Sequence, residues 1–347
     1  MRKLPTTFKV IIGIALLVNL ASFPVTTVSS NSTPYPMAAY EIAQTTDLSG
    51  VTVGLYESYH SSTDNRIELS RTALYNMFRW MNATVHILNR TDILNGALWT
   101  CEILCIPEGL GPYIQSNLGY DAMDMIKEWI SLGGSYMGVR GASTIAFSDG
   151  YFEGNAETFY MDLINGTSIG MSSYGYIVMS ELELNKDITS GPDFSSFPNT
   201  MNVFWRTGRY FEANEGQEMI TLASYTYNDQ PAIVAAKYGE GNVLASSPQF
   251  EFEEDDDRDG VDYYDESYDD PDSEWPLVLE ICKWMIEDSP TVANTTTWAY
   301  PETSDTASST TDDTNQPLII PMETIMLTIG IVAVVAIVAT VVLMKKR

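Results

Sequence analysis

The sequence predicts an α/β domain in which a mostly parallel sheet is covered on both faces by helices. Between residues 51 and 139, short β-rich runs alternate with stretches that repeat apolar residues at helical spacing. The run at 101–107 is almost wholly apolar, as is typical of a strand buried on both faces. Strand and helix alternating at this rhythm imply right-handed crossovers and therefore parallel pairing.

Each helix and strand expected in the first half of the domain is indicated by a feature of its own sequence. The helix expected over 62–82 places Leu69, Ala73, Leu74, Met77 and Phe78 on one face. A short helix near 91–99 has Thr91 or Asp92 as its candidate cap, and an amphipathic helix over 121–134 ends at a glycine stop. The strands expected between these helices are 51–58, 84–89, 101–107 and 135–139.

The second half of the domain is richer in strands. Its strand candidates are rich in β-branched and aromatic residues, and a helix over 274–288 closes the domain. The candidates read GYIVMSEL, NVFWRTGRYF, MITLASYT, AIVAAKY and NVLASSP.

Both ends of the chain carry apolar segments that are set apart from the domain. Residues 1–30 place basic residues before a short apolar run, which is typical of a signal peptide or an N-terminal signal anchor. Residues 325–344 are uncharged and long enough to form a transmembrane helix, and the basic tail 345–347 should stay in the cytoplasm. We therefore expect a single-pass cell-membrane protein whose main domain, residues 50–288, lies outside the cytoplasm.

The segment between domain and anchor, residues 289–320, is expected to be a stalk. Up to residue 317 it is rich in Ser, Thr, Pro and Asp and cannot bury enough apolar surface to offset its chain entropy. Sequons fit an exported glycoprotein. The candidate glycosylation sites in and beside the domain are Asn82, Asn89, Asn165 and Asn294.

The charge and the cysteines exclude some classes of partner and site. A net charge of −28, from 46 acidic and 18 basic residues, would repel nucleic acid and anionic lipid from the outer domain, so no nucleic-acid partner is expected. The three cysteines, Cys101, Cys105 and Cys282, are an odd number without metal spacing. We expect them to be buried free thiols, with Cys101 and Cys105 on one face of their strand.

The acidic segment DDDRDGVDYYDE, residues 255–266, fits the calcium-loop pattern D-x-D-x-D-G-x5-E. Alternate carboxylates converge on a hard cation because Gly260 permits the sharp turn. The flanking helix pair of an EF-hand is not apparent, and a solvated acidic loop remains the alternative to a calcium site. The candidate ligands are Asp255, Asp257, Asp259, Asp262 and Glu266.

Two further segments carry a family resemblance. CIPEGLGPYIQSNLGYDAMDMIKEWISLGGSYMGVRGAS and, downstream, QPAIVAAKYGEGNVLASSPQFEFE resemble the class I glutamine amidotransferase-like superfamily. The branch they look most like is the domain at the N-terminus of biotin-protein ligases. The resemblance covers most of residues 50–288 and implies a flavodoxin-like three-layer sandwich with a mostly parallel sheet. It also implies a proline-glycine loop after the third strand, a GGxYxGxCAG elbow whose cysteine is the nucleophile, and a late SPHPE segment that supplies histidine and glutamate.

At the positions that carry the family's chemistry, the chain differs. The cysteine position falls on Arg140 and the histidine position on Gln249, while Glu251 is retained. A guanidinium stays protonated and an amide does not titrate, so neither can replace the thiolate or the imidazole. The resemblance therefore implies a degenerate triad and a pseudoenzyme that acts as a binding or structural module, with calcium as its one candidate cofactor.

Arg140 has two open interpretations. With the backbone N–H groups of the elbow, it would suit a carboxylate or another small anion, and the candidate contacts are Arg140, Gly141, Ser143, Glu108 and His60. Alternatively, an ion pair with Glu108 or Glu251 fills the former active site. The alternative function is a hydrolase or amidotransferase with a relocated nucleophile, and Ser143 with His60 is the pair to consider for it. A third possibility is an envelope component defined by its glycans and its anchor, for which the cleft is irrelevant. The candidate partners of the outer domain are a small anionic ligand or a protein.

Overall fold

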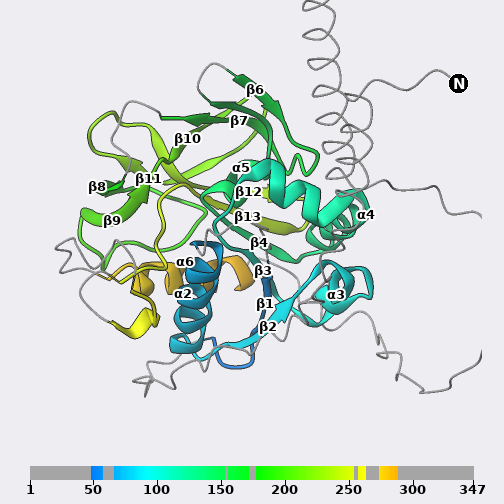
Figure 1. Ribbon diagram of the computed structural model, residues 1–347. Coiled ribbons are helices and arrows are strands. Elements are labelled where there is room, and N and C mark those ends of the chain that lie inside the picture. Colours follow the sequence, from blue (N-terminus) through cyan, green and yellow to red (C-terminus); the bar gives the residue numbers. More distant parts are fainter. Residues whose placement is uncertain are drawn as a thin grey trace, which may run out of the picture. The chain divides into compact units, whose positions relative to one another are not determined.

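The computed structural model describes residues 48–57, 66–152, 155–171, 177–253, 257–262 and 273–287. They form an α/β domain built on two sheets (Figure 1). No helix in this part of the chain is long and apolar enough to cross a membrane. The expected signal segment, stalk, transmembrane helix and basic tail all lie outside the described residues.

The larger sheet has nine strands in the order β2-β1-β3-β4-β13-β12-β11-β8-β9, and its first half is parallel. Here β2, β1, β3, β4 and β13 run side by side in one direction. These strands are β1 (Thr52–Tyr56), β2 (Thr84–Leu88), β3 (Ile103–Ile106), β4 (Ser135–Val139) and β13 (Gly241–Ser246). The segments between them include α2 (Arg66–Trp80), α3 (Arg90–Leu94), η1 (Ala97–Thr100) and α4 (Gly111–Ser131).

The other half of the large sheet is antiparallel. β12 (Pro231–Tyr238), β11 (Ile220–Tyr225), β8 (Ile177–Leu184) and β9 (Thr200–Arg206) continue the sheet from β13. Of its eight described pairings, four are parallel and four are antiparallel. The sheet is therefore mixed, and the expectation of a mostly parallel sheet was wrong. The reason is the short connections that join β11, β12 and β13, because such turns permit antiparallel pairing alone.

A second sheet of four strands has the order β10-β7-β5-β6. Its strands are β5 (Phe147–Phe152), β6 (Asn155–Thr158), β7 (Ile164–Gly170) and β10 (Arg209–Ala213). The segment NVFWRTGRYF, expected as a single strand, is divided between β9 and β10. The turn at Thr207 and Gly208 carries the chain from the large sheet to the small one.

Two apolar cores lie on opposite faces of the large sheet. One contains Ile103 and Val139 together with α2 and α6 (Trp275–Glu287), and the other contains Leu104 with α4 and part of the small sheet. All three cysteines are buried and free, as expected. Cys105 lies in the first core and Cys101 in the second, so the expectation that they share one face was wrong. The strand begins only at Ile103, and the alternation of side chains does not extend back to residue 101.

Two helices begin at residues other than the expected ones. α4 begins at Gly111, ahead of the expected start at residue 121, because Pro112 lies in its first turn, where proline favours a helix start. Gly119, with φ 68°, interrupts this helix in the middle. The cap of α3 is Asn89 rather than Thr91 or Asp92, and the Asn89 and Asp92 side chains form a reciprocal capping box.

Candidate functional site

The elbow after β4 keeps the backbone shape of a nucleophile turn. The chain passes from Val139 through Arg140 into the short helix α5 (Gly141–Ile145), and Arg140 has φ 51° and ψ −110°. Non-glycine residues occupy this region at a cost of about 1–3 kcal/mol, and such residues cluster at functional sites. Gly141 is required here, since a Cβ atom would lie 1.7 Å from the carbonyl oxygen of Gly109. The elbow is therefore packed directly against the loop that follows β3.

The guanidinium of Arg140 uses all three of its nitrogens inside the protein. Nε donates to the carbonyl of Arg206 at 2.9 Å, one terminal nitrogen to Glu108 Oε1 at 2.8 Å, and the other to Thr207 Oγ1 at 2.6 Å. The Arg140 and Glu108 side chains are 13% and 2% exposed. Of the two ion-pair partners that the sequence offered, the structure has Glu108. Removing one member of such a buried pair costs about 3–5 kcal/mol.

A chain of hydrogen bonds connects Arg140 to both late triad positions. The second oxygen of Glu108 accepts from the side-chain amide of Gln249, and the Glu108 backbone N–H donates to Ser70 Oγ at 3.1 Å. The Ser70 hydroxyl donates in turn to Glu251 Oε1 at 2.6 Å. The structure thus brings Arg140, Gln249 and Glu251 into one buried network with Glu108 at its centre.

Glu251 is a buried carboxyl group without a cationic partner in this network. Burial raises its pKa to about 8, and the nearby charge of Glu108 adds to the rise, while the Ser70 hydrogen bond opposes it. At neutral pH the group is therefore mostly protonated. Glu251 Oε2 and Gln249 Oε1 have no hydrogen-bond partner within the described part of the chain.

The candidate nucleophile Ser143 is fully buried at the start of α5. Its backbone N–H donates to the carbonyl of Arg140 at 3.1 Å, and its hydroxyl donates to the same oxygen. His86 is the only histidine among the described residues, and it lies on the edge strand β2, separated from β4 by β1 and β3. His60 lies outside the described residues.

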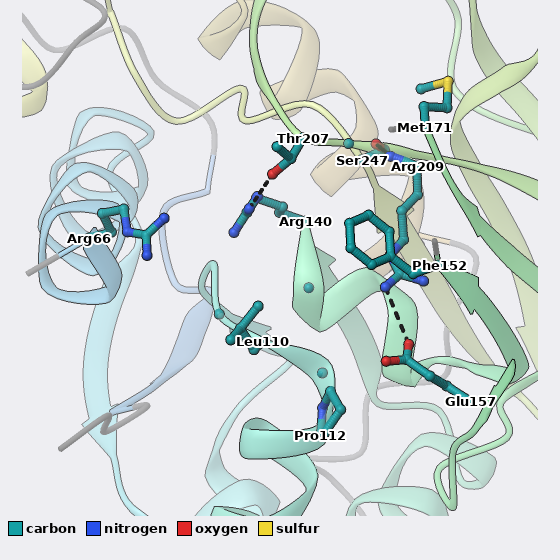
Figure 2. A pocket seen from close by; sticks show the side chains of 14 residues that line it. Arg66, Leu110, Pro112, Arg140, Phe152, Glu157, Met171, Thr207, Arg209 and Ser247 are labelled. Carbon is teal, nitrogen blue, oxygen red and sulfur yellow. Dashed lines mark hydrogen bonds and ion pairs between the residues drawn. The ribbon is translucent and has the colours of Figure 1, made fainter. Parts of the chain in front are cut away.

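A pocket of about 600 Å³ opens beside the elbow (Figure 2). One wall comes from Arg66, the loop 109–112 and the elbow itself. The opposite wall comes from the small sheet and from the β9–β10 turn, and its side chains include Phe152, Glu157, Met171, Thr207 and Arg209. A smaller pocket of about 190 Å³ shares Arg66, Gly109, Leu110 and Arg140 with the first and adds Glu108, Ile67 and Tyr113.

Arg209 is the principal cation on the second wall. Its guanidinium pairs with Glu157 Oε2 at 3.3 Å, donates to the carbonyl of Ser168 at 3.2 Å, and lies 5.3 Å from the centre of the Phe152 ring. Burial lowers its pKa from the ordinary value, Glu157 opposes this, and the positive charge of Arg140 adds to the lowering. An arginine nevertheless stays protonated near neutrality.

The lining of the larger pocket holds three arginines and one glutamate. Counting Glu108 of the smaller pocket, basic groups still outnumber acidic ones by one in a chain whose net charge is −28. The lining of the pocket is thus rich in arginine, although the chain as a whole is strongly acidic.

The model of the family described as "Biotin-protein ligase, N terminal" matches residues 57–270. The chain belongs to this family. The matched region includes the elbow, the Glu108 loop, most of the pocket and both late triad positions, so the resemblance seen in the sequence is confirmed.

Solved structures with a similar fold include a putative ThuA-like protein from Bacteroides uniformis. That protein is 10% identical with a TM-score of 0.47, covering 72% of this chain and 96% of its own. A glutamine amidotransferase from Thermotoga maritima is 13% identical with a TM-score of 0.44, covering 70% of this chain and 98% of its own. The comparison with curated proteins found no match.

In this member of the biotin-protein ligase N-terminal family, the described part of the acidic loop is held by the protein itself. Asp259 is fully buried, and its carboxylate accepts from the backbone N–H groups of Val261 at 3.0 Å and Glu253 at 3.2 Å. Its carbonyl accepts from the Asn76 side chain on α2 at 2.6 Å. Arg258 pairs with Glu253 and lies 4.5 Å from the Trp275 ring.

The calcium prediction falls mostly on residues that the structure does not describe. Asp255, Glu266 and the side chain of Asp257 lie outside the described residues, and Asp262 is exposed. The described residues include no group of three or more side chains that could hold a metal ion. Calcium therefore stays a prediction.

Most of the pocket side chains that sequence reasoning missed come from the small sheet and its connecting turn, while Arg66 of the pocket and Ser70 of the buried network, both on α2, were missed as well. Thr207, with φ 40°, binds Arg140 from the β9–β10 turn, and Arg209 follows two residues later. A β-branched residue with positive φ is a strained outlier. The one signal in the sequence was RTGR, a glycine-containing turn between two arginines, inside a segment that otherwise looks like a single strand.

Proposed function

We propose that this protein is a membrane-anchored, extracytoplasmic member of the family that acts as a non-catalytic binding module. Its ligand is a small organic anion, such as a carboxylate or a phosphate ester, held in the pocket beside Arg140. The observation that carries the proposal is the arginine-rich lining of this pocket in a chain of net charge −28. A strongly anionic protein repels anions in general, so a local excess of arginine at a concave site favours their selective binding.

The absence of turnover follows from the chemistry of the residues at the triad positions. The Arg140 guanidinium has no usable lone pair, and all three of its nitrogens donate to protein oxygens. Gln249 cannot take or return a proton, and its amide donates to Glu108. The Ser143 hydroxyl is occupied by the Arg140 carbonyl, which weighs against the alternative of a relocated nucleophile.

Arg140 and Arg209 have different parts in this proposal. Arg140 is held by Glu108 and Thr207 and forms the inner wall of the pocket. Arg209 is held by a longer contact to Glu157 and is stacked on Phe152, so a ligand carboxylate can share its guanidinium. The N-terminus of α4 lies at the same pocket through Gly111 and Pro112, and its dipole adds to the positive potential.

The location rests on the sequence of both ends. The apolar run 325–344, with its basic tail, is the proposed anchor, and residues 1–30 direct export.

The binding proposal is tested by titrating the purified full-length protein with succinate and with inorganic phosphate at pH 7 and low ionic strength, using isothermal calorimetry. We expect at least one of them to bind, and Arg209→Met to weaken that binding by about tenfold or more, since a charge-assisted hydrogen bond is worth about 1.5–3 kcal/mol. Arg79→Met is the matched control, because it removes the same charge from the last turn of α2, about 20 Å along the helix from Arg66. Absence of binding by both anions, or an equal loss in the two variants, would reject the proposal.

Catalysis is tested separately with electrophilic glutamine analogues. We expect the intact mass of the protein to stay unchanged after incubation, because Arg140 and Gln249 at the triad positions cannot supply an activated nucleophile and its base. A stable adduct that maps to Ser143 would instead support the hydrolase or amidotransferase alternative.

A further inference from the structure

Two of the sequons bracket one strand of the large sheet. Asn82 lies in the turn between α2 and β2 with φ 64°, and Asn89 follows directly after β2 as the cap of α3. Both asparagines are exposed, and so are Thr84 and Thr91, the hydroxyl residues of the two sequons. N-linked oligosaccharides are bulky and occur at protein surfaces, and both sequons lie at the surface of the folded domain.

The strand between them is an edge of the sheet. β2 is the terminal strand in the described order and pairs with β1 alone. Its sequence, TVHIL, contains no lysine, glutamate or proline, which are the residues that usually protect an edge from pairing with another chain. Four of its five residues are at least partly exposed, and Ile87 is 42% exposed. The edge therefore lacks the ordinary side-chain protection.

The atoms that would carry sugar are compatible with both local structures. The capping box uses Oδ1 of Asn89, which accepts from the Asp92 N–H at 3.1 Å, while Nδ2 has no hydrogen-bond partner among the described residues. Nδ2 of Asn82 donates to Ser49 Oγ at 2.6 Å. A glycosylated amide keeps one N–H, so this hydrogen bond can persist after modification.

The sequon at Asn165 has a different setting. Asn165 belongs to β7, which lies between β10 and β5 in the small sheet. Its backbone N–H donates to Gln217 Oε1 at 3.1 Å, and its Oδ1 accepts from the Asn214 side chain at 2.8 Å. Asn165 is itself exposed, but Gly166 is buried and Thr167, the hydroxyl residue of this sequon, is half-buried. This sequon is therefore constrained on both sides by neighbouring chain.

We propose that Asn82 and Asn89 carry N-linked oligosaccharides that cover the free edge of the large sheet, and that Asn165 remains unmodified in the folded protein. The two sites are separated by roughly 20 Å of extended chain, so sugars at both ends flank the whole strand. In the modification, Nδ2 forms a bond to the anomeric carbon of a lipid-phosphate-linked oligosaccharide. The amide loses one proton, and the lipid phosphate leaves with the electron pair of the broken C–O bond. The inference rests on the proposed extracytoplasmic location.

Glycopeptide mass spectrometry of the full-length protein, isolated from its own membrane or from a host that performs N-glycosylation, tests the assignment. We expect hexose-containing peptides at Asn82 and Asn89 and an unmodified peptide at Asn165. Protease treatment of intact cells, followed by detection of the domain, shows whether the domain faces outward. It therefore distinguishes a failure of the glycosylation proposal from a failure of the proposed location. An outward-facing domain without sugar at Asn82 and Asn89 overturns this inference alone, whereas a protected domain overturns the proposed location as well.

The protective role is tested with the double variant Thr84→Ala and Thr91→Ala, which removes both sequons and keeps both asparagines, including the α3 cap. Thr167→Ala is the matched control, since it removes the sequon in β7. We expect the apparent molar mass in light scattering after size-exclusion chromatography to rise at least twofold for the double variant and to stay unchanged for the control. Circular dichroism confirms folding in each case. A double variant that has lost its sugars but keeps the parental molar mass overturns the covering role.

Discussion

Replacing Glu251 by glutamine should make the stability of the domain less dependent on pH. Glu251 is fully buried, and burial raises its pKa to about 8 from an ordinary value of 4.5. Because the pKa is raised in the folded state, the protonated form is favoured by folding. The contribution to stability is fully present below pH 4.5 and is lost as the pH rises toward 8. Glutamine has nearly the same shape, keeps an oxygen that can accept from Ser70, and does not ionise.

The size of the effect follows from the difference between the two pKa values. At 1.36 kcal/mol for each unit, the wild-type protein loses about 5 kcal/mol between pH 4.5 and pH 8 through this one group. The slope is about 1.4 kcal/mol per pH unit in that window, and it disappears above pH 8. The self-repulsion of a chain with net charge −28 also changes with pH, but it is common to both proteins and cancels in their difference.

Urea denaturation followed by tryptophan fluorescence at pH 5, 6, 7, 8 and 9 measures this difference directly. We expect the stability of Glu251→Gln relative to wild type to rise steadily from pH 5 and to level off near pH 8. Glu181→Gln, an exposed carboxylate on β8, is the control and should give a nearly constant difference. If the wild-type and Glu251→Gln proteins lose stability in parallel over the whole range, the pKa of Glu251 is not raised by burial.

Three further changes give measurable outcomes. Glu108→Gln should lower the free energy of unfolding by about 3–5 kcal/mol, because it leaves the Arg140 guanidinium buried without its counter-charge, and urea denaturation at pH 6 measures the loss. A loss below 1 kcal/mol would mean that Arg140 finds another partner. Asp259→Asn should destabilise by about 1–3 kcal/mol, equally in calcium and in chelator, because the carboxylate accepts two backbone N–H groups. A loss confined to calcium-containing buffer would instead support the calcium loop. Asn89→Ala should cost about 1 kcal/mol through the α3 cap, and Asn89→Asp should restore most of it in the same denaturation assay.

The parallel half of the fold could be predicted because its signals are local. The strand at Ser135–Val139 has the expected bounds, and the closing helix ends within one residue of them at each side. These segments owe their structure to their own apolar periodicity and to glycine or proline at their ends. The elbow and the position of Arg140 within it followed from the same kind of signal.

The small sheet could not be predicted in this way. β5 and β7 contain glycine and polar residues at irregular spacing, and the other neighbour of β7 is β10, which lies far along the chain. Long-range pairing of this kind leaves no periodic trace in either segment. Since the small sheet supplies one wall of the pocket, Phe152, Glu157 and Arg209 were missed together with it. The part of the site that could be predicted from the sequence, with Glu108 and Arg140, lies in the loops that follow the parallel strands β3 and β4.

The two interpretations of Arg140 that the sequence left open are physically compatible. Arg140 and Thr207 both have positive φ, come from opposite walls, and are joined by a hydrogen bond, so the contact holds the two walls of the pocket at a fixed separation. Glu108 neutralises the charge of Arg140 and fixes its orientation, which leaves Arg209 with its longer contact to Glu157 as the cation that a ligand can engage. Residues held in strained backbone conformations cluster at functional sites. Strain that is kept beside a 600 Å³ cavity therefore favours a pocket maintained for a ligand.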